Sequence, residues 1–243
     1  MAYLLIAVVS VSASFLLAVV LWRLGIRYGW HREIRARDVH KEPTPRLGGI
    51  ALYAAMAVGA LVASTLPEFS AVFDNPRPVI AVFGGAFIVV AVGVVDDLID
   101  LDWLTKLSGQ ILAAGVIAWQ GVQIVSLPIG GITLFSPTLS LVLTVLAIVL
   151  VMNAVNFIDG LDGLVAGVAL ISNGVFFLYA FVLDSSDQAS PYFSLATILT
   201  VLLAGSLLGF LPINWNPAKL FMGDSGALLV GLMMAVSAIS VTG

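Results

Sequence analysis

Clusters of acidic side chains adjoin the long apolar segments of this chain. The first cluster contains the neighbouring pair Asp96 and Asp97, at the end of a segment rich in glycine and valine. Adjacent carboxylates this close to hydrocarbon repel each other unless a cation or a basic group compensates them. The pair is therefore a candidate for binding a metal ion or for moving a proton.

The second cluster has polar residues at every third position. Asn153, Asn156, Asp159 and Asp162 recur at this spacing. On an ideal helix a three-residue repeat drifts by about 60° per step, so the four side chains cannot share one face. The glycines among them indicate that the helix breaks near Gly160, which exposes backbone groups along with the carboxylates. Broken helices of this kind bind charged ligands in membrane proteins.

Two further polar stretches complete the set. Asp224 begins the last apolar segment, where it fits a residue that caps a helix through its side-chain oxygen. Capping does not explain the amide, aromatic and lysine residues before it, in the stretch NWNPAKLFMGDSG. The other stretch, HKEPTPRLGG, combines prolines that fix an extended turn with a glycine pair that allows an anion to approach the backbone.

Carboxylates, amides and lysines in this combination suit phosphate chemistry. Carboxylate oxygens are ligands for Mg²⁺, which usually keeps water and substrate phosphates in its coordination shell. Together with basic side chains, Mg²⁺ stabilises displacement at phosphorus. The chain lacks a G-x-x-x-x-G-K-[ST] motif, which excludes a P-loop nucleotidase. We therefore predict a site that uses Mg²⁺, with Mn²⁺ as the alternative ion.

The composition defines the surroundings of this site. Apolar residues make up 60% of the 243 residues and charged residues only 10%, against roughly a quarter charged in a soluble domain. The net charge of −4 excludes a nucleic-acid binder. The absence of cysteine excludes thiolate metal sites and thiol nucleophiles. The sequence predicts an all-α polytopic membrane protein, with one catalytic domain over residues 1–243.

Apolar runs long enough to span a bilayer occur eight times. They lie near residues 3–22, 48–66, 78–95, 104–120, 139–155, 163–183, 192–211 and 225–242. Between the fourth and fifth runs, residues 121–138 contain glycines and prolines among β-branched residues, which predicts a short hairpin-like loop outside the bilayer. We therefore expect about eight transmembrane helices.

Basic residues indicate the orientation of these helices. Seven of the ten Lys and Arg residues fall between Arg23 and Arg46. The positive-inside rule places that loop in the cytoplasm and the N-terminus outside. Counting spans from there places every acidic cluster on the cytoplasmic face, where one substrate would be a lipid. Lys106, on the same side, fits either a phosphate contact or an interfacial anchor.

A secondary transporter is the alternative from another functional class. Transporters carry ionisable groups or broken helices near the bilayer midplane and show repeat symmetry between their halves. Here the acidic residues lie at the ends of the spans, the middle positions are apolar, and the halves show no repeat. The pattern favours an enzyme, with a non-catalytic remnant that only binds its ligand or partners as the remaining alternative.

Four blocks of the sequence resemble, in the same order, the polyprenyl-phosphate N-acetylhexosamine-1-phosphate transferase family. They are HKEPTPRLGG, GVVDDLIDL, NAVNFIDGLDGL and NPAKLFMGDSG. The PRLGG form is similar to the branch that uses UDP-N-acetylglucosamine, and the peptidoglycan branch, which transfers phospho-N-acetylmuramoyl-pentapeptide, is the alternative. The resemblance implies a bacterial plasma-membrane enzyme in which a polyprenyl phosphate attacks the β-phosphorus of the UDP-sugar and UMP leaves.

The resemblance also implies roles for matching residues. Asp96 matches the carboxylate that deprotonates or positions the lipid phosphate, Asp97 supports the metal site, and Asp224 matches the Mg²⁺ ligand. Asp159 matches a residue of the catalytic cleft. The matching substrate contacts are Lys41 for phosphate, Asn156 in the cleft, Gly160, Leu161 and Asp162 in the uridine turn, and Asn214 and Phe221 for the nucleoside.

One departure from the family concerns histidine. Family members continue for further spans and carry a histidine-rich loop, whereas this chain has only His31 and His40. The resemblance therefore implies a C-terminal truncation. Small-residue pairs such as Gly205 and Gly209 predict either helix packing or a homodimer.

Overall fold

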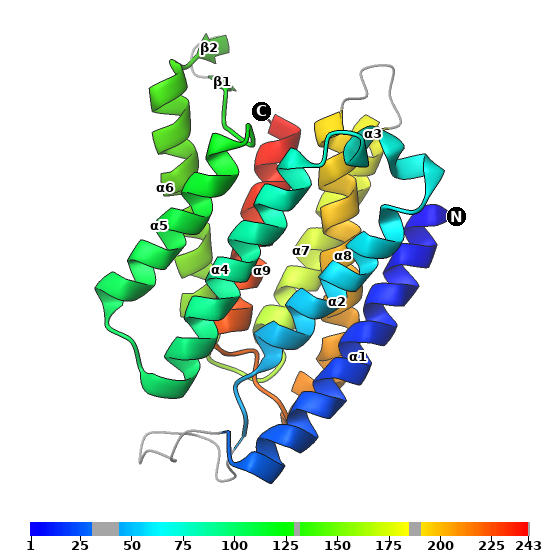
Figure 1. The fold of residues 1–243 in the computed structure, drawn as a ribbon, viewed down its shortest axis with the longest axis vertical. Coiled ribbons are helices and arrows are strands. Elements are labelled where there is room, and N and C mark those ends of the chain that lie inside the picture. The colour runs from blue at the N-terminus through cyan, green and yellow to red at the C-terminus, as the bar shows by residue number, and fades with distance from the viewer. Residues whose placement is uncertain (31–43, 129–131, 185–190, 243) are drawn as a thin grey trace.

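The computed structural model describes residues 1–30, 44–128, 132–184 and 191–242. Within these ranges almost every segment is helical (Figure 1). The long helices are α1 (Ala2–Tyr28), α2 (Gly48–Ala63), α4 (Arg77–Ile99), α5 (Trp103–Trp119), α6 (Pro137–Ile158), α7 (Leu164–Asp184), α8 (Pro191–Asn214) and α9 (Gly223–Thr242). The shorter elements are the 3-10 helix η1 (Pro67–Phe69), α3 (Ser70–Phe73), β1 (Ser126–Pro128) and β2 (Ile132–Leu134).

The length and apolarity of these helices confirm a multi-pass membrane protein. Among the described residues, 6 helices are long and apolar enough to cross a membrane, and a bent pair raises the total to 7. The bent pair is α2 with the segment Pro67–Phe73, at 101° to it. The eight predicted runs each correspond to a long helix, but α2 with 16 residues and α5 with 17 residues are shorter than the roughly 20 residues of a full span. The count of eight spans therefore stays a prediction.

Helices α8 and α9 form the centre of the bundle. Most of their residues are buried, whereas most residues of α1 and α6 are accessible and face outward. In Figure 1, α1 and α2 lie to one side of α8, and α5 and α6 lie on the far side of α4 and α9. The start of α9 and the ends of α4, α6 and α8 meet at the lower end of the view. This is the end that carries the acidic clusters.

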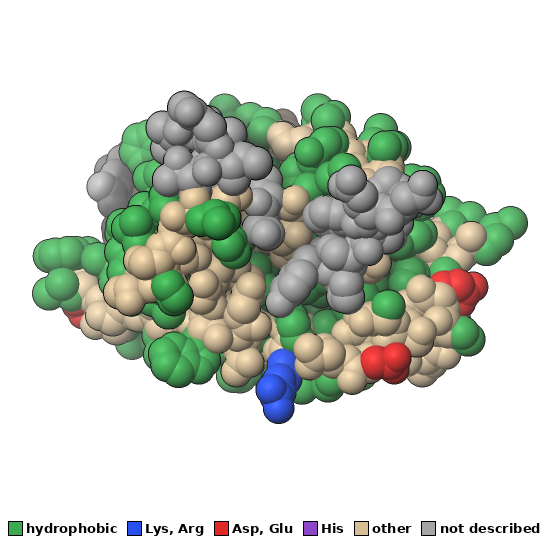
Figure 2. Space-filling model, turned by 90° about the horizontal axis from the view of Figure 1, so that it is seen from above, with side chains coloured by type: hydrophobic (Ala, Val, Ile, Leu, Met, Phe, Trp, Pro, Cys, Tyr) green, Lys and Arg blue, Asp and Glu red, His purple; other side chains and the backbone are tan. Residues whose placement is uncertain are grey.

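The loop predicted near residues 121–138 contains the strands β1 and β2. They pair antiparallel, with Ser126 opposite Leu134. The segment before β1 is fixed to α6, because the Ile124 amide donates a hydrogen bond to Thr144 Oγ1 at 2.9 Å. This end of the molecule, viewed in Figure 2, carries scattered charged side chains among apolar ones. Its position outside the bilayer stays a prediction.

Small residues are used for packing inside the chain. A Cβ at Gly205 would lie 2.8 Å from the Ala7 carbonyl oxygen, and a Cβ at Gly209 only 2.2 Å from that of Val11. The glycines of α8 therefore allow α1 to approach closely, in agreement with the predicted helix packing. A homodimer stays a prediction.

Two other glycines bring α2 and α4 onto the start of α9. A Cβ at Gly93 of α4 would lie 2.3 Å from Ser225 Cα, and a Cβ at Gly49 of α2 would lie 2.5 Å from the Gly226 nitrogen. Since both neighbours are backbone atoms, neither contact can be relieved by a side-chain rotation. The start of α9, and with it Asp224, is fixed by these two contacts.

We expect Gly93→Ala to destabilise the protein by about 1–3 kcal/mol, because the added methyl group would overpack against α9. Gly84→Ala is a matched control in the same helix, since no atom lies within 4 Å of a Cβ there. The thermal unfolding midpoints of the two variants in detergent provide the comparison. Equal midpoints would show that α4 can move away from α9 without cost.

Candidate active site

A cluster of charged and amide side chains joins four helices at the lower end of the bundle. Lys106 Nζ of α5 lies 2.6 Å from Asp96 Oδ2 of α4 and 2.8 Å from Asp224 Oδ2 of α9. Asn156 of α6 contributes a side-chain hydrogen bond to Asp224. Residues far apart in the sequence therefore form one ionic site, as the placement of the acidic clusters predicted.

The turn between α4 and α5 places Asp96 opposite Lys106. Asp96 lies one turn before the end of α4, and its Oδ1 accepts a hydrogen bond from the Leu101 amide at 2.7 Å. The chain reverses at Asp100, which has a left-handed backbone with φ of 63°, and Asp102 then caps the start of α5 through its side chain. The first turn of α5 therefore runs beside the last turn of α4.

Asp97 connects α4 to the start of α9. Its Oδ1 accepts a hydrogen bond from the Asp224 amide at 3.1 Å, and its Oδ2 accepts one from the Ser225 amide at 3.2 Å. The side chain is buried, and its negative charge lies where the helix dipole of α9 is positive. Asp97 therefore caps α9 from another helix and orients Asp224. Its predicted support of the metal site is compatible with this position.

Asp159 follows the last residue of α6, so the helix ends where the glycines predicted a break. Burial, with a smaller contribution from repulsion by Asp224, raises the pKa of Asp159 to about 7. The positive charge of the Arg46 guanidinium lowers this pKa and so partly offsets the effect of burial. The site thus concentrates negative charge in a partly desolvated position, which is an arrangement that attracts a cation.

A pair of amides extends the polar site one turn further along α5 and α6. Asn153 Nδ2 donates a hydrogen bond to Gln110 Oε1 at 2.5 Å. Gln110 is buried and lies four residues after Lys106, on the same face of α5. From the sequence, Lys106 fitted either a phosphate contact or an interfacial anchor, and Gln110 was not predicted as a site residue. Because Lys106 and Gln110 are four residues apart, the sequence could have placed them on one face of α5. The structure shows that this face lies against the asparagines of α6.

The predicted site residues fall into three groups. Asp96, Asp97, Asn156, Asp159 and Asp224 lie in or beside the ionic cluster. The predicted nucleotide contacts lie next to it: Gly160, Leu161 and Asp162 between α6 and α7, Asn214 as the last residue of α8, and Phe221 between α8 and α9. Lys41, with His31 and His40, lies outside the described residues.

The oxygen donors of the cluster are of the kind that Mg²⁺ prefers. No group of three His, Cys, Asp or Glu side chains within the described ranges has the arrangement of a metal site. Mg²⁺, however, is commonly bound by one or two carboxylates together with substrate phosphates and water. The Lys106 ammonium lies between two carboxylates, which shows that a cation fits there. The residues present therefore fit Mg²⁺ bound with a phosphate substrate.

The region that contains these helices matches a known family model. The match to glycosyl transferase family 4 covers residues 79–242. The chain belongs to glycosyl transferase family 4. The matched range includes the whole ionic cluster and both adjacent loops. The resemblance inferred from the four sequence blocks is therefore confirmed.

Relatives of this family 4 chain have named activities. A decaprenyl-phosphate N-acetylglucosaminephosphotransferase of Mycolicibacterium smegmatis is 41% identical over 90% of this chain and 55% of the relative. A probable undecaprenyl-phosphate N-acetylglucosaminyl 1-phosphate transferase of Bacillus subtilis is 32% identical over 94% of this chain and 60% of the relative. A phospho-N-acetylmuramoyl-pentapeptide-transferase of M. smegmatis is 32% identical over all of this chain and 77% of the relative. The chain spans about half the length of the decaprenyl-phosphate relatives it matches.

Proposed function

We propose that this chain transfers N-acetylglucosamine-1-phosphate from UDP-N-acetylglucosamine to a polyprenyl phosphate and releases UMP. The observation that carries the proposal is the contact of Lys106 with both Asp96 and Asp224 at one end of a membrane-embedded bundle. Membership of family 4 and the names of the relatives support it. We place the site on the cytoplasmic face of a bacterial plasma membrane, where the UDP-sugar is available.

The reaction exchanges one phosphorus–oxygen bond for another. A phosphate oxygen of the lipid bonds to the β-phosphorus, and the bond from that phosphorus to the bridging oxygen breaks, so that UMP leaves. A phosphate monoester has a second pKa of about 6, so the lipid phosphate is largely ionised at neutral pH. Asp96 therefore acts mainly by positioning the acceptor, and removal of a proton contributes little.

The residues of the ionic cluster divide the remaining tasks. We assign Mg²⁺ to Asp224, with support from Asp97, and the bound ion would neutralise charge on the diphosphate. Lys106 holds the two facing carboxylates together before substrate binds and supplies a positive charge to the phosphates. Asp159 and Asn156 line the same site from the end of α6, with Asn156 orienting the Asp224 carboxylate.

The choice of donor tests this proposal against the peptidoglycan branch. We expect the chain to release UMP from UDP-N-acetylglucosamine in preference to its galactosamine epimer and to UDP-N-acetylmuramoyl-pentapeptide. The measurement is the initial rate of UMP release with each donor at the same lipid and Mg²⁺ concentrations. A preference for the pentapeptide donor would support the other branch, and a preference for the epimer would overturn the assigned hexosamine.

A further inference from the structure

The segment before α2 lies across the loop that leads into α9. The Phe221 amide donates a hydrogen bond to the Pro45 carbonyl oxygen at 2.9 Å. The Gly48 amide donates a hydrogen bond back to the Phe221 carbonyl oxygen at 3.0 Å. Arg46 lies between these two contacts, so its backbone is held against the loop from both sides.

The Arg46 backbone also lies beside the residue that precedes Asp224. A Cβ at Gly223 would lie 2.7 Å from the Arg46 carbonyl oxygen and 2.6 Å from Asp97 Oδ2. Gly223 has a left-handed backbone with φ of 70°, which together with these contacts requires glycine. One glycine therefore separates Arg46 from the carboxylate to which we assign Mg²⁺.

The Arg46 side chain acts on the end of a different helix. Its neighbours Pro45 and Leu47 are buried, whereas Arg46 is half-buried, so its side chain does not pack into the core with theirs. The positive charge of Arg46 lowers the pKa of Asp159, which directly follows α6. The guanidinium therefore lies within electrostatic range of Asp159, although its backbone is fixed to the loop before α9.

Arg46 and Lys106 reach the site from different elements. Lys106 of α5 contacts Asp96 and Asp224, whereas Arg46, two residues before α2, acts on Asp159. Figure 1 shows the start of α5 and the start of α2 on opposite sides of the lower part of α4. The two positive charges therefore serve different carboxylates of one site.

The other basic side chains described near this end are directed elsewhere. Lys219 Nζ lies 5.0 Å from the centre of the Trp22 ring on α1. Arg23 and Arg27 are exposed on the last turns of α1. Within the described ranges, Arg46 is thus the basic residue that accompanies Lys106 at the site.

The substrates of the proposed reaction need a second positive side chain. The donor carries two ionised phosphates, and the lipid phosphate is largely doubly ionised at neutral pH. An arginine fork matches phosphate oxygens with two parallel hydrogen bonds. Because Lys106 contacts Asp96, to which we assign the acceptor, the lipid lies on the Lys106 side. Arg46, on the Asp159 side, is left for the donor.

We infer that Arg46 binds a phosphate of the UDP-sugar, and that Asp159 holds its guanidinium until the donor arrives. This inference rests on the proposed function and adds a donor contact that the sequence blocks did not indicate. Negative charge builds up on UMP as the bond to the β-phosphorus breaks, and the Arg46 guanidinium stabilises that charge. Arg46 does not contact the acceptor lipid.

UDP and uridine separate a phosphate contact from a packing role, because uridine keeps the nucleoside and has no phosphate. Arg46→Met removes the charge and keeps most of the length of the side chain. We expect the dissociation constant of UDP to rise by roughly tenfold or more in this variant, with that of uridine unchanged. In the transfer assay, the KM for the UDP-sugar should rise and the KM for polyprenyl phosphate should not.

Two further variants complete the comparison. Arg27→Met makes the same change of charge at an exposed position in the last turn of α1, and should leave all four constants at their wild-type values. Arg46→Lys keeps the charge but loses the fork, so it should recover part of the UDP affinity. If Arg46→Met does not fold, Arg46→Lys still predicts weaker binding of UDP with unchanged binding of uridine.

The outcomes distinguish this inference from the proposed function. Equal losses of UDP and uridine affinity in Arg46→Met, or no loss of either, would overturn the donor contact. A higher KM for the lipid alone would overturn it as well. A wild-type chain that binds UDP through Arg46 but releases no UMP would refute the transfer and leave the contact in place. Absence of UDP binding by the wild-type chain would overturn both.

Discussion

Replacing Asp224 with asparagine is expected to lower the rate of UMP release by about three orders of magnitude. The substitution removes the negative charge that contacts Lys106 and to which we assign Mg²⁺. The substitution preserves the shape of the side chain. The hydrogen bonds from the backbone amides of residues 224 and 225 to Asp97 do not involve the Asp224 side chain and should remain. The loss should therefore occur in the rate, while the thermal unfolding midpoint changes little.

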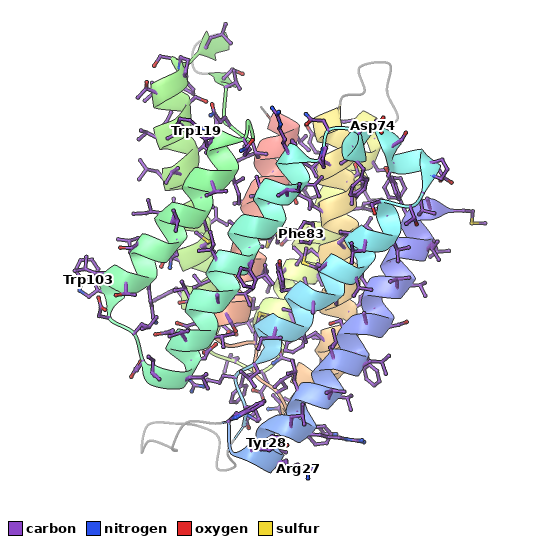
Figure 3. The ribbon with its side chains drawn as sticks, in the orientation of Figure 1. Arg27, Tyr28, Asp74, Phe83, Trp103 and Trp119 are labelled. Carbon is purple, nitrogen blue, oxygen red and sulfur yellow. The ribbon has the colours of Figure 1, made fainter. Side chains whose placement is uncertain are left out.

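Asp74→Asn is the control for this experiment. Asp74 is exposed and lies at the upper end of the bundle in Figure 3. Asp224 is in the first turn of α9, which begins at the lower end (Figure 1). Its amide variant changes the net charge by the same amount and should keep the wild-type rate. If Asp224→Asn also keeps that rate, the ionic cluster is not the reaction site.

The second large effect is expected for Lys106→Met. Without the ammonium group, Asp96 and Asp224 face each other uncompensated and the substrate phosphates lose a positive partner. We expect the rate of transfer to fall about a hundredfold. The affinity for Mg²⁺ in the absence of substrate should rise, since the ion no longer competes with Lys106 for the carboxylates. Calorimetric titration and UMP release measure the two effects.

Arg23→Met separates this account from an interfacial anchor. Arg23 is an exposed basic residue near the end of α1, and it has the anchoring position that was the alternative for Lys106. If Lys106 were only an anchor, the two variants would behave alike. In Lys106→Met we expect a lower transfer rate and a higher affinity for Mg²⁺, and in Arg23→Met we expect neither change. This difference would identify Lys106 as part of the site.

Most of the helical fold could be predicted because apolar runs and polar breaks are local features. The run predicted near 78–95 corresponds to α4, and the break expected near Gly160 lies directly after the end of α6 at Ile158. The 101° bend after α2 could not be predicted in this way. The apolar run continues to Leu66, so composition gives no sign that the helix already ends at Ala63.

The residues of the site could be predicted from the sequence better than the contacts between them. Counting the spans brought the acidic clusters to one end, and the structure brings Asp96 and Asp224 to the same lysine. The role of Lys106 depends on the tight reversal at Asp100, which composition does not reveal. The hydrogen bonds of Asp162 and Asn214 join loops that are distant in sequence, so no local spacing could indicate them.

The most direct test of the central proposal is UMP release from UDP-N-acetylglucosamine by the purified chain. Three reactions are compared: the complete mixture, the mixture without polyprenyl phosphate, and the mixture without Mg²⁺. The proposal predicts UMP release in the complete reaction and none when either the lipid or the metal is left out. Absence of release in the complete reaction, or release that continues without the lipid, would contradict transfer to a polyprenyl phosphate.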